Sequence, residues 1–437
     1  MSTTGLLPDP APAPLVPVVV PPQSTASETF AVGVTPTAEG SAATAPRVAS
    51  KPLPPKPQNA RYESLDMWRG VACLCLVLYH AAFFCETSMR VGDVGSWSIA
   101  DSFLYAIKKT WCGVPIFFVI SGYCIAASLD SLRRKPHSLL HFFSRRMHRI
   151  YPPLWIASLV AVGWLFLGQT LWNMQGASEH LPYLSELTAV QWFGNFTATE
   201  RWLHHLTGGD VRYLMANTWT LCYEEQFYAL AGLMLLLAPR RPLTLALVLS
   251  LATLIGRHLC RSLDLNIEGF FFDGHWLLFA SGLLVYQAVN YFTRRQVVPV
   301  AVLLACGAVY GWWERRTGPE WFDQHLGEYF LVSSLFALFL IAAKRFDRVI
   351  ARHWLAWPFA WCGKRSYSIY LTHFPLVVAL AYGLHAWGLQ DAWSTVFITV
   401  PACVAVSLLS GWVFFNLVER HFQNATSAPT GNAAAAT

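Results

Sequence analysis

The sequence is poor in charged residues. Only 13% of its 437 residues are Asp, Glu, Lys or Arg, against about a quarter in an ordinary soluble domain, and 54% are hydrophobic. The sequence also lacks the phosphate loop GxxxxGK[ST], the nucleophile elbow GxSxG and the zinc helix HExxH. These absences leave a nucleotide-hydrolysing pump and an intramembrane metalloprotease without support.

The cysteines do not follow a metal-binding pattern. None of the ten forms a pair of CxxC motifs or a CxxC with HxxxH, so we predict no metal site. Most lie in apolar runs, where a thiol acts as a small buried hydrophobic group. Cys85 and Cys112 should both lie at the outer ends of their spans, so that a disulfide and two free thiols are both open alternatives.

Apolar runs of about 18–20 residues, enough to cross a bilayer core, recur along the chain. They predict an all-α, polytopic transmembrane helix bundle of about ten spans. A Pro/Ala-rich segment (1–60) and a short segment (423–437) should be disordered tails on either side of a membrane domain (61–422). The expected spans lie near 67–85, 112–130, 151–168, 218–238, 242–259, 269–290, 297–313, 327–343, 367–387 and 393–416.

The distribution of basic residues predicts the topology. Lys and Arg gather in one alternate set of loops, and the positive-inside rule assigns these loops and both termini to the cytoplasm. We therefore expect a multi-pass protein of the inner (cytoplasmic) membrane, with lipid rather than nucleic acid around it. The longest outer loop, near 169–217, should hold an interfacial helix. The basic loops are those with Arg133, Arg134, Lys135, Arg145, Arg146 and Arg149, then Arg240 and Arg241, then Arg294 and Arg295, and finally Lys344 to Arg365.

Ionisable residues within spans are costly and indicate function. Arg69 and His80 are eleven residues apart, which places them on one helix face about 16 Å apart in height. Glu224 and Glu225 enter from the outer side and should reach the depth of His80. These three groups could form an acid–base site, whereas the alternative is a buried ion pair that fixes helix packing.

Other polar residues have two interpretations each. Arg146 and Arg149 share a helix face at the inner boundary, where guanidinium groups suit phosphate oxygens but also touch anionic lipid headgroups. Ser121, next to a glycine, favours close helix packing. His373 and His275 fit structural histidines bonded to backbone carbonyls, or catalytic ones.

Six segments together resemble the acyltransferase 3 family of polytopic membrane enzymes, which acylate extracytoplasmic glycans and some small molecules. Their order and spacing hold from about residue 61 to 422. Trp68 and Cys222 depart from residues common in the family, but neither replaces a proposed catalytic group. The segments are "LDMWRGVACLCLVLYH", "GVPIFFVISGYCI", "RRMHRIYPPLW", "TWTLCYEEQFY", "SYSIYLTHFPL" and "FNLVERHF".

The resemblance implies an O-acyltransferase that uses acyl-CoA, by default acetyl-CoA, as a substrate rather than as a tightly bound cofactor. The acceptor would be a hydroxyl of an extracytoplasmic carbohydrate or glycoconjugate. No esterase-like domain is expected after the membrane domain. A transporter or flippase for a glycan or lipid-linked sugar is the alternative, although the two halves show no inverted repeat. For the acyltransferase, we predict catalysis by His80, Glu224 and Glu225. Arg69, Arg146 and Arg149 should bind the donor, and Asp66, Ser121 and His373 should bind substrate.

Overall fold

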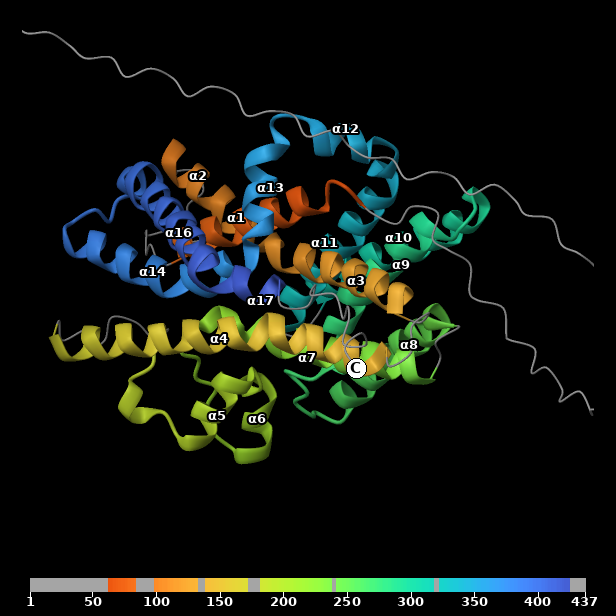
Figure 1. Cartoon of the computed structure of the whole chain (residues 1–437), viewed down its shortest axis with the longest axis horizontal. Coiled ribbons are helices and arrows are strands. Elements are labelled where there is room, and N and C mark those ends of the chain that lie inside the picture. The colour runs from red at the N-terminus through yellow and green to blue at the C-terminus, as the bar shows by residue number, and fades with distance from the viewer. Residues whose placement is uncertain are drawn as a thin grey trace, which may run out of the picture. The chain divides into compact units, whose positions relative to one another are not determined.

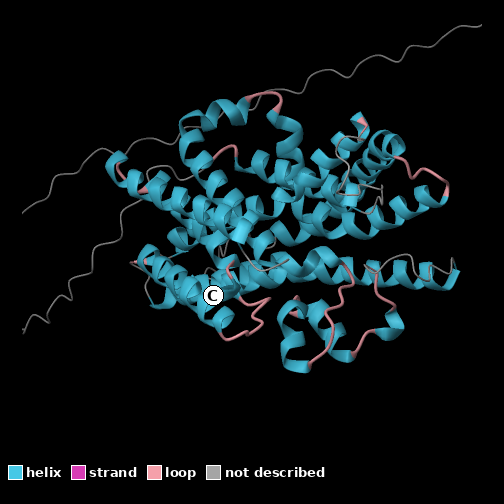
Figure 2. Cartoon of the chain, turned by 180° about the vertical axis from the view of Figure 1, so that it is seen from behind, coloured by secondary structure: helices cyan, strands magenta, loops and turns pink. Residues whose placement is uncertain are grey.

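The computed structural model describes residues 62–83, 98–132, 138–171, 181–237, 241–317 and 322–424. Within these ranges the chain forms helices joined by loops and turns, and no strand (Figure 2). The predicted all-α class is therefore confirmed. The predicted tails, residues 1–60 and nearly all of 423–437, lie outside the described ranges.

The helices follow one another along the chain (Figure 1). Several of them are longer than the runs predicted for them, among them α4, α10 and α11. π-Helical turns at Thr395–Thr399 and Phe415–Glu419 flank α16. The helices are α1 (Leu65–Phe83), α2 (Ile99–Lys108), α3 (Gly113–Leu132), α4 (Ser138–Leu171), α5 (Ala189–Thr197), α6 (Glu200–Thr207), α7 (Trp219–Leu237), α8 (Pro242–Ser262), α9 (His275–Asn290), α10 (Arg294–Thr317), α11 (Phe322–Ala343), α12 (Asp347–Arg352), α13 (Ala356–Lys364), α14 (Ser366–Ala386), α15 (Ala392–Ser394), α16 (Val400–Phe414) and α17 (Arg420–Asn424).

Each of the ten predicted spans coincides with a helix, and eight of the helical segments are long and apolar enough to cross a membrane. The other two predicted spans are α7 and α9. The 16 residues of α9 rise about 24 Å, less than the roughly 30 Å of a bilayer core, and most of them are buried. Helix α7 carries two adjacent glutamates in its first half. Helix α9 is largely enclosed by the protein, so it does not need the length of a lipid-facing span, whereas α7 is buried over its first half and exposes Leu236 and Leu237 at its end.

Helix α4 lies between the bundle and the helices of the longest predicted outer loop. Its 34 residues rise about 51 Å. It contacts α3, α7 and α14 of the bundle, and also α5. In Figure 1, α5 and α6 lie on the opposite side of α4 from α1, α14 and α16. The described part of this loop forms two short helices, and the interfacial position expected for a helix there stays a prediction.

Glycines let neighbouring helices meet backbone to backbone at several places, of which two concern the helices around Arg69 and Ser121. A Cβ at Gly122 would lie 2.0 Å from the carbonyl oxygen of Phe279, so α3 packs directly on α9, as the small residues of this span predicted. A Cβ at Gly70 would lie 1.8 Å from the carbonyl oxygen of Phe359, and one at Gly363 would lie 1.7 Å from that of Asp66. Helix α13 is therefore pressed against the first turns of α1, next to Arg69.

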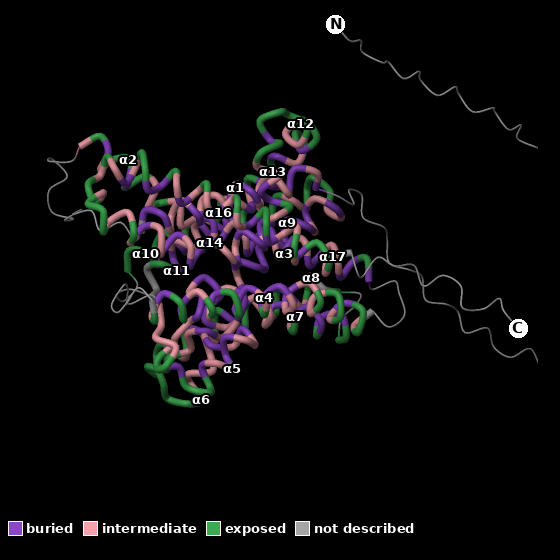
Figure 3. Tube along the Cα trace, turned by 60° about the vertical axis from the view of Figure 1, so that its left-hand side comes forward, coloured by how far each residue is buried: buried purple, intermediate pink, exposed green. Residues whose placement is uncertain are grey.

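Burial follows this packing. Buried residues are frequent in α3, α9 and α14, whereas α12 is largely exposed (Figure 3). Aromatic rings fill much of the core between α3, α7 and α9, including Phe118, Tyr223, Phe227, Trp276 and Phe279. The polar residues among these helices therefore lie in a rigid, well-packed surrounding.

Candidate active site

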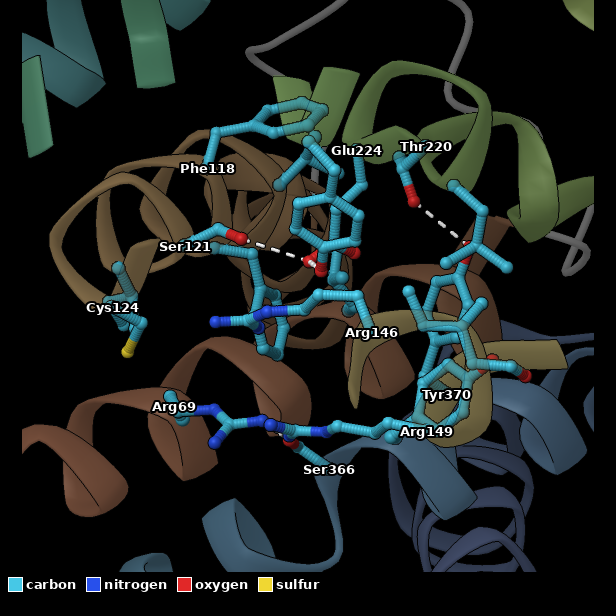
Figure 4. A pocket seen from close by; sticks show the side chains of 18 residues that line it. Arg69, Phe118, Ser121, Cys124, Arg146, Arg149, Thr220, Glu224, Ser366 and Tyr370 are labelled. Atoms are coloured by element: carbon cyan, nitrogen blue, oxygen red, sulfur yellow. Dashed lines mark hydrogen bonds between the residues drawn. The ribbon is translucent and has the colours of Figure 1, made fainter. Parts of the chain in front are cut away.

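A cavity of about 140 Å³ lies between α1, α3, α4, α7 and α14. Its lining holds three guanidinium groups, a carboxylate, and apolar and aromatic side chains (Figure 4). Five helices far apart in the sequence contribute to it. The lining residues are Arg69, Leu76, Val114, Phe117, Phe118, Ile120, Ser121, Cys124, Arg146, Arg149, Ile150, Thr220, Leu221, Glu224, Tyr228, Ser366, Tyr367 and Tyr370.

Arg69 and Arg149 extend toward each other from opposite walls of this cavity (Figure 4). Arg69 donates to the hydroxyl of Ser366 at 3.0 Å and lies 3.9 Å from the carboxylate of Asp66. Among the described residues, no carboxylate forms an ion pair with Arg149.

Arg146 lies between two rings and a hydroxyl. It donates to Ser128 at 2.9 Å, and its guanidinium carbon lies 5.2 Å from the centre of the Tyr228 ring and 5.8 Å from that of Phe142. These contacts hold the guanidinium plane without neutralising its charge. Arg146 and Arg149, which their three-residue spacing places on one helix face, thus line the same cavity as Arg69.

A larger cavity of about 710 Å³ shares these three arginines with the first. Arg145 and Lys364 add two further cations to its lining, and Asp66 is the carboxylate among its lining residues. Five cationic side chains against one carboxylate make this chamber strongly attractive to an anion. We call it the basic chamber and the first cavity the inner channel.

Glu224 and Glu225, adjacent on α7, have different surroundings. The carboxylate of Glu224 faces the inner channel and accepts hydrogen bonds from the hydroxyls of Ser121, at 2.9 Å, and Tyr228, at 2.5 Å. Glu225 lies outside the channel lining, beside Tyr151, and its Oε1 has no hydrogen-bond partner among the described residues. Only the first of the two glutamates can meet a molecule in the channel.

The imidazole of His80 meets that of His373. Nδ1 of His80 lies 3.0 Å from Nε2 of His373, and Nδ1 of His373 lies 2.9 Å from the carbonyl oxygens of both Ile369 and Tyr370. His373 thus has the bond to neighbouring carbonyls that belongs to one of its two interpretations, and this bond leaves the catalytic interpretation open. Phe374 covers the His80 ring edge-to-face at 5.2 Å between ring centres.

Neither histidine lines the inner channel, but residues about one helical turn before each of them do. The channel lining includes Leu76, one turn or about 6 Å before His80 on α1, and Tyr370, about one turn before His373 on α14. The phenol of Tyr370 also bonds Thr220 at 2.9 Å across the channel (Figure 4). The basic chamber, the channel and the histidine pair therefore follow one another along α1 and α14.

Some predicted site residues meet as expected and others do not. Arg69, Arg146 and Arg149 converge on one chamber, and Asp66 joins them there, whereas Ser121 lies deeper, against Glu224. We predicted a carboxylate beside His80, but the hydrogen bond of His80 goes to His373 instead. Ser366 and Tyr370 were not predicted as site residues, although both fall in the segment "SYSIYLTHFPL".

Outside the membrane-spanning segments, Glu200 at the start of α6 is 3% exposed, and burial raises the pKa of its carboxyl to about 7. The backbone N–H of Arg212 donates to it at 3.0 Å and partly opposes this rise in pKa.

Cys112 is a free thiol whose neighbour is Cys75, and its predicted partner Cys85 lies outside the described residues.

A bundle with eight helical segments long and apolar enough to cross a membrane indicates a multi-pass membrane protein. The chain belongs to the acyltransferase 3 family, because the family model described as an acyltransferase domain matches residues 62–414. The family and the similar proteins below show that the chain is an O-acyltransferase. No solved structure matches it.

Three relatives illustrate the similarity. The "Putative membrane-bound transacylase BcsY" of Komagataeibacter xylinus is 26% identical over 336 residues, 75% of each chain. The O-acetyltransferase OatA of Staphylococcus aureus is 26% identical over 320 residues, 65% of this chain and 49% of OatA. The peptidoglycan O-acetyltransferase OatA of Listeria monocytogenes is 30% identical over 173 residues, 38% of this chain and 22% of that protein. The chain thus spans about half the length, or less, of the two OatA proteins.

Proposed function

We propose that the protein transfers an acyl group, by default acetyl, from cytoplasmic acyl-CoA to a hydroxyl of an extracytoplasmic glycan, with His80 as the general base. The observation that carries this proposal is the order of basic chamber, inner channel and histidine pair along α1 and α14. In this proposal both termini and the basic chamber face the cytoplasm, in the cytoplasmic membrane. This follows from the positive-inside rule.

The basic chamber suits the nucleotide end of acyl-CoA. Coenzyme A carries phosphates that hydrocarbon cannot accommodate, and arginine forks bind phosphate oxygens through charge-assisted, bidentate hydrogen bonds. Arg149 and Arg146 offer such forks. Arg69 already donates a hydrogen bond to Ser366, and its guanidinium group lines both the basic chamber and the inner channel. Asp66, beside Arg69, then contributes to the donor side of the substrate site.

The inner channel suits the pantetheine arm. Arg69 and His80 are separated by about 16 Å of helix rise, a length that an extended pantetheine arm can span. This arm has two amide N–H groups, and Glu224 is the carboxylate that faces the channel. Ser121 and Tyr228 fix Glu224 as an acceptor for such an N–H group. We therefore assign Glu224 to donor alignment. Glu225 keeps the predicted catalytic role only as an open prediction.

The reaction that follows is an acyl transfer with a balanced proton count. The acceptor hydroxyl gives its proton to His80 as its oxygen attacks the thioester carbonyl. The carbon–sulfur bond breaks, and the thiolate of coenzyme A takes the proton back from the imidazolium. The products are an ester on the glycan and free coenzyme A, with His80 neutral again.

The acceptor is proposed from the relatives. Two of them are named as O-acetyltransferases, and one of these acts, by its name, on peptidoglycan. A polysaccharide or glycoconjugate hydroxyl outside the membrane is accordingly the acceptor class that we propose. Nothing in the comparisons supports the transporter or flippase alternative.

The test is acyl transfer by the full chain purified into nanodiscs. Wild-type protein should consume acetyl-CoA and release free thiol only when an acceptor glycan is added, and ester should appear on the glycan by mass spectrometry. His80→Ala should insert and elute normally but release thiol at less than about a hundredth of the wild-type rate, because a general base contributes about 10²–10⁴-fold. Normal turnover by His80→Ala would exclude the proposed base, whereas solute uptake into vesicles without thiol release would favour a transporter.

A further inference from the structure

The imidazole of His373 is fixed from one side by the backbone of its own helix. Its Nδ1 lies 2.9 Å from the carbonyl oxygens of Ile369 and Tyr370, and the residue is 1% exposed. A carbonyl oxygen can only accept a hydrogen bond, so Nδ1 of His373 must carry a hydrogen. In the neutral ring the other nitrogen, Nε2, is then an acceptor.

This acceptor sets the tautomer of His80. Nε2 of His373 lies 3.0 Å from Nδ1 of His80, so Nδ1 of His80 must be the donor. The hydrogen of a neutral His80 therefore resides on Nδ1, and its Nε2 carries the free lone pair. The opposite arrangement would require a doubly protonated His373 in a buried site, which desolvation disfavours.

From this geometry we infer that His373 is a positioning residue that holds His80 in the Nδ1–H tautomer and so keeps Nε2 of His80 as the base. The inference rests on the proposed function, in which His80 takes the acceptor proton. When Nε2 takes that proton, Nδ1–H of the resulting imidazolium still donates to His373, now as a charge-assisted hydrogen bond. A neutral histidine thus takes the place of the carboxylate that usually orients a catalytic imidazole.

A second contact extends this chain of hydrogen bonds to α7. The side-chain N–H of Asn217, just before α7, donates to the carbonyl oxygen of Tyr370 at 2.5 Å, and the phenol of Tyr370 donates to the carbonyl oxygen of Asn217 at 2.5 Å. The carbonyl that holds His373 is itself held by this reciprocal pair. Helices α1, α7 and α14 are therefore coupled at the level of the base.

Two substitutions at one position separate positioning from packing. His373→Gln can place an amide oxygen near the former Nε2 and accept from His80. His373→Asn keeps an amide near the former Nδ1, where it can bond the backbone carbonyl, but it is too short to reach His80. For His373→Gln we expect kcat within about tenfold of wild type. For His373→Asn we expect kcat to fall roughly ten- to a hundredfold, the range found when a group that hydrogen-bonds a metal-binding histidine is mutated.

The kinetic readout distinguishes this role from substrate binding, which we had also considered for His373. Positioning predicts that kcat falls in His373→Asn while the KM values for acetyl-CoA and for the acceptor stay within about threefold of wild type. A raised acceptor KM with unchanged kcat would overturn the inference in favour of direct acceptor binding. Equal activity of the Gln and Asn variants would overturn it in favour of a packing role.

Controls keep these outcomes separate from failure of the proposed function. Thr372→Val, on the same helix, removes a hydroxyl that bonds Ser410 and should leave turnover unchanged. Each variant is compared by elution profile and thermal unfolding in detergent, and His80→Ala is measured in parallel. An inactive His80→Ala with fully active His373 variants refutes the positioning role alone, whereas an active His80→Ala refutes the base as well.

Discussion

Arg146 and Arg149 carry cationic charge that no described carboxylate neutralises, in a chamber they share with Arg69. Hydrogen bonds to charged groups contribute about 1.5–3 kcal/mol, so the loss of one phosphate contact should weaken donor binding roughly ten- to a hundredfold. We therefore expect Arg146→Ala with Arg149→Ala to raise the KM for acetyl-CoA at least tenfold and to leave the acceptor KM within about threefold. Initial rates of thiol release at fixed ionic strength measure both constants.

A matched control removes the same charge elsewhere. Arg294 and Arg295 are exposed, belong to another predicted cytoplasmic loop and line neither cavity. Their double alanine variant should keep the wild-type KM for acetyl-CoA. A similar rise in both double variants would mean that overall charge, rather than the basic chamber, determines donor affinity.

At the scale of single residues, the sequence predicts position along a helix better than it predicts partners. The three-residue spacing of Arg146 and Arg149 and the eleven-residue spacing of Arg69 and His80 place each pair on one face, because both follow from helix geometry. The partner of His80 depends on how α1 packs against α14, 293 residues later in the chain. Local sequence carries no signal for that contact beyond the presence of an ionisable residue in each span.

At the scale of helices, the contact of α1 with α13 supports the donor site. A Cβ at Gly70 would lie 1.8 Å from the carbonyl oxygen of Phe359, and backbone there cannot yield without moving a helix. We expect Gly70→Ala to destabilise the protein by about 1–3 kcal/mol, the usual cost of overpacking, and to raise the KM for acetyl-CoA, since Arg69 is the adjacent residue. Thermal unfolding in detergent and initial-rate kinetics are the measurements.

The control for this variant is Gly163→Ala in α4, where an added Cβ would meet nothing within 4 Å. Alanine has a higher helix propensity than glycine by about 1 kcal/mol, so this variant should unfold at the same or a higher temperature. If Gly70→Ala behaves like Gly163→Ala, the close contact between α1 and α13 is not required.

The pair of helices α5 and α6 should respond to pH through Glu200. Because its pKa is raised to about 7 by burial, the packed state favours the protonated carboxyl. The stabilisation is therefore complete below the ordinary glutamate pKa of about 4.3 and is lost as the pH rises through 7. Hydrogen exchange in α6, corrected for intrinsic rates, should be slower at pH 6 than at pH 8, and Glu200→Gln should remove most of that difference. An unchanged difference in Glu200→Gln would assign it to another group.

Helix α13 shows where prediction of the elements fails. Hydropathy places helices at all ten predicted spans, because long apolar runs have few alternatives in a membrane. The segment between Lys344 and Arg365 is basic and was predicted as an inner loop, yet it forms α12 and α13. Its role in packing depends on Gly363 meeting the backbone of α1, a tertiary contact that composition does not reveal.

At the scale of the whole molecule, the proposal requires that donor and acceptor reach the histidine pair from opposite sides of the membrane. The basic loops and the basic chamber belong to one side by the positive-inside rule, and acetyl-CoA does not cross a bilayer.

Sealed inside-out membrane vesicles that contain acceptor glycan in their lumen should therefore incorporate label from externally added radioactive acetyl-CoA. Sealed right-side-out vesicles should incorporate label only after permeabilisation, which also serves as the control for equal enzyme content. Inside-out vesicles with His80→Ala should remain unlabelled. Labelling of sealed right-side-out vesicles by external donor would contradict the cytoplasmic assignment of the basic chamber, even if every substitution in that chamber raised the KM for acetyl-CoA as expected.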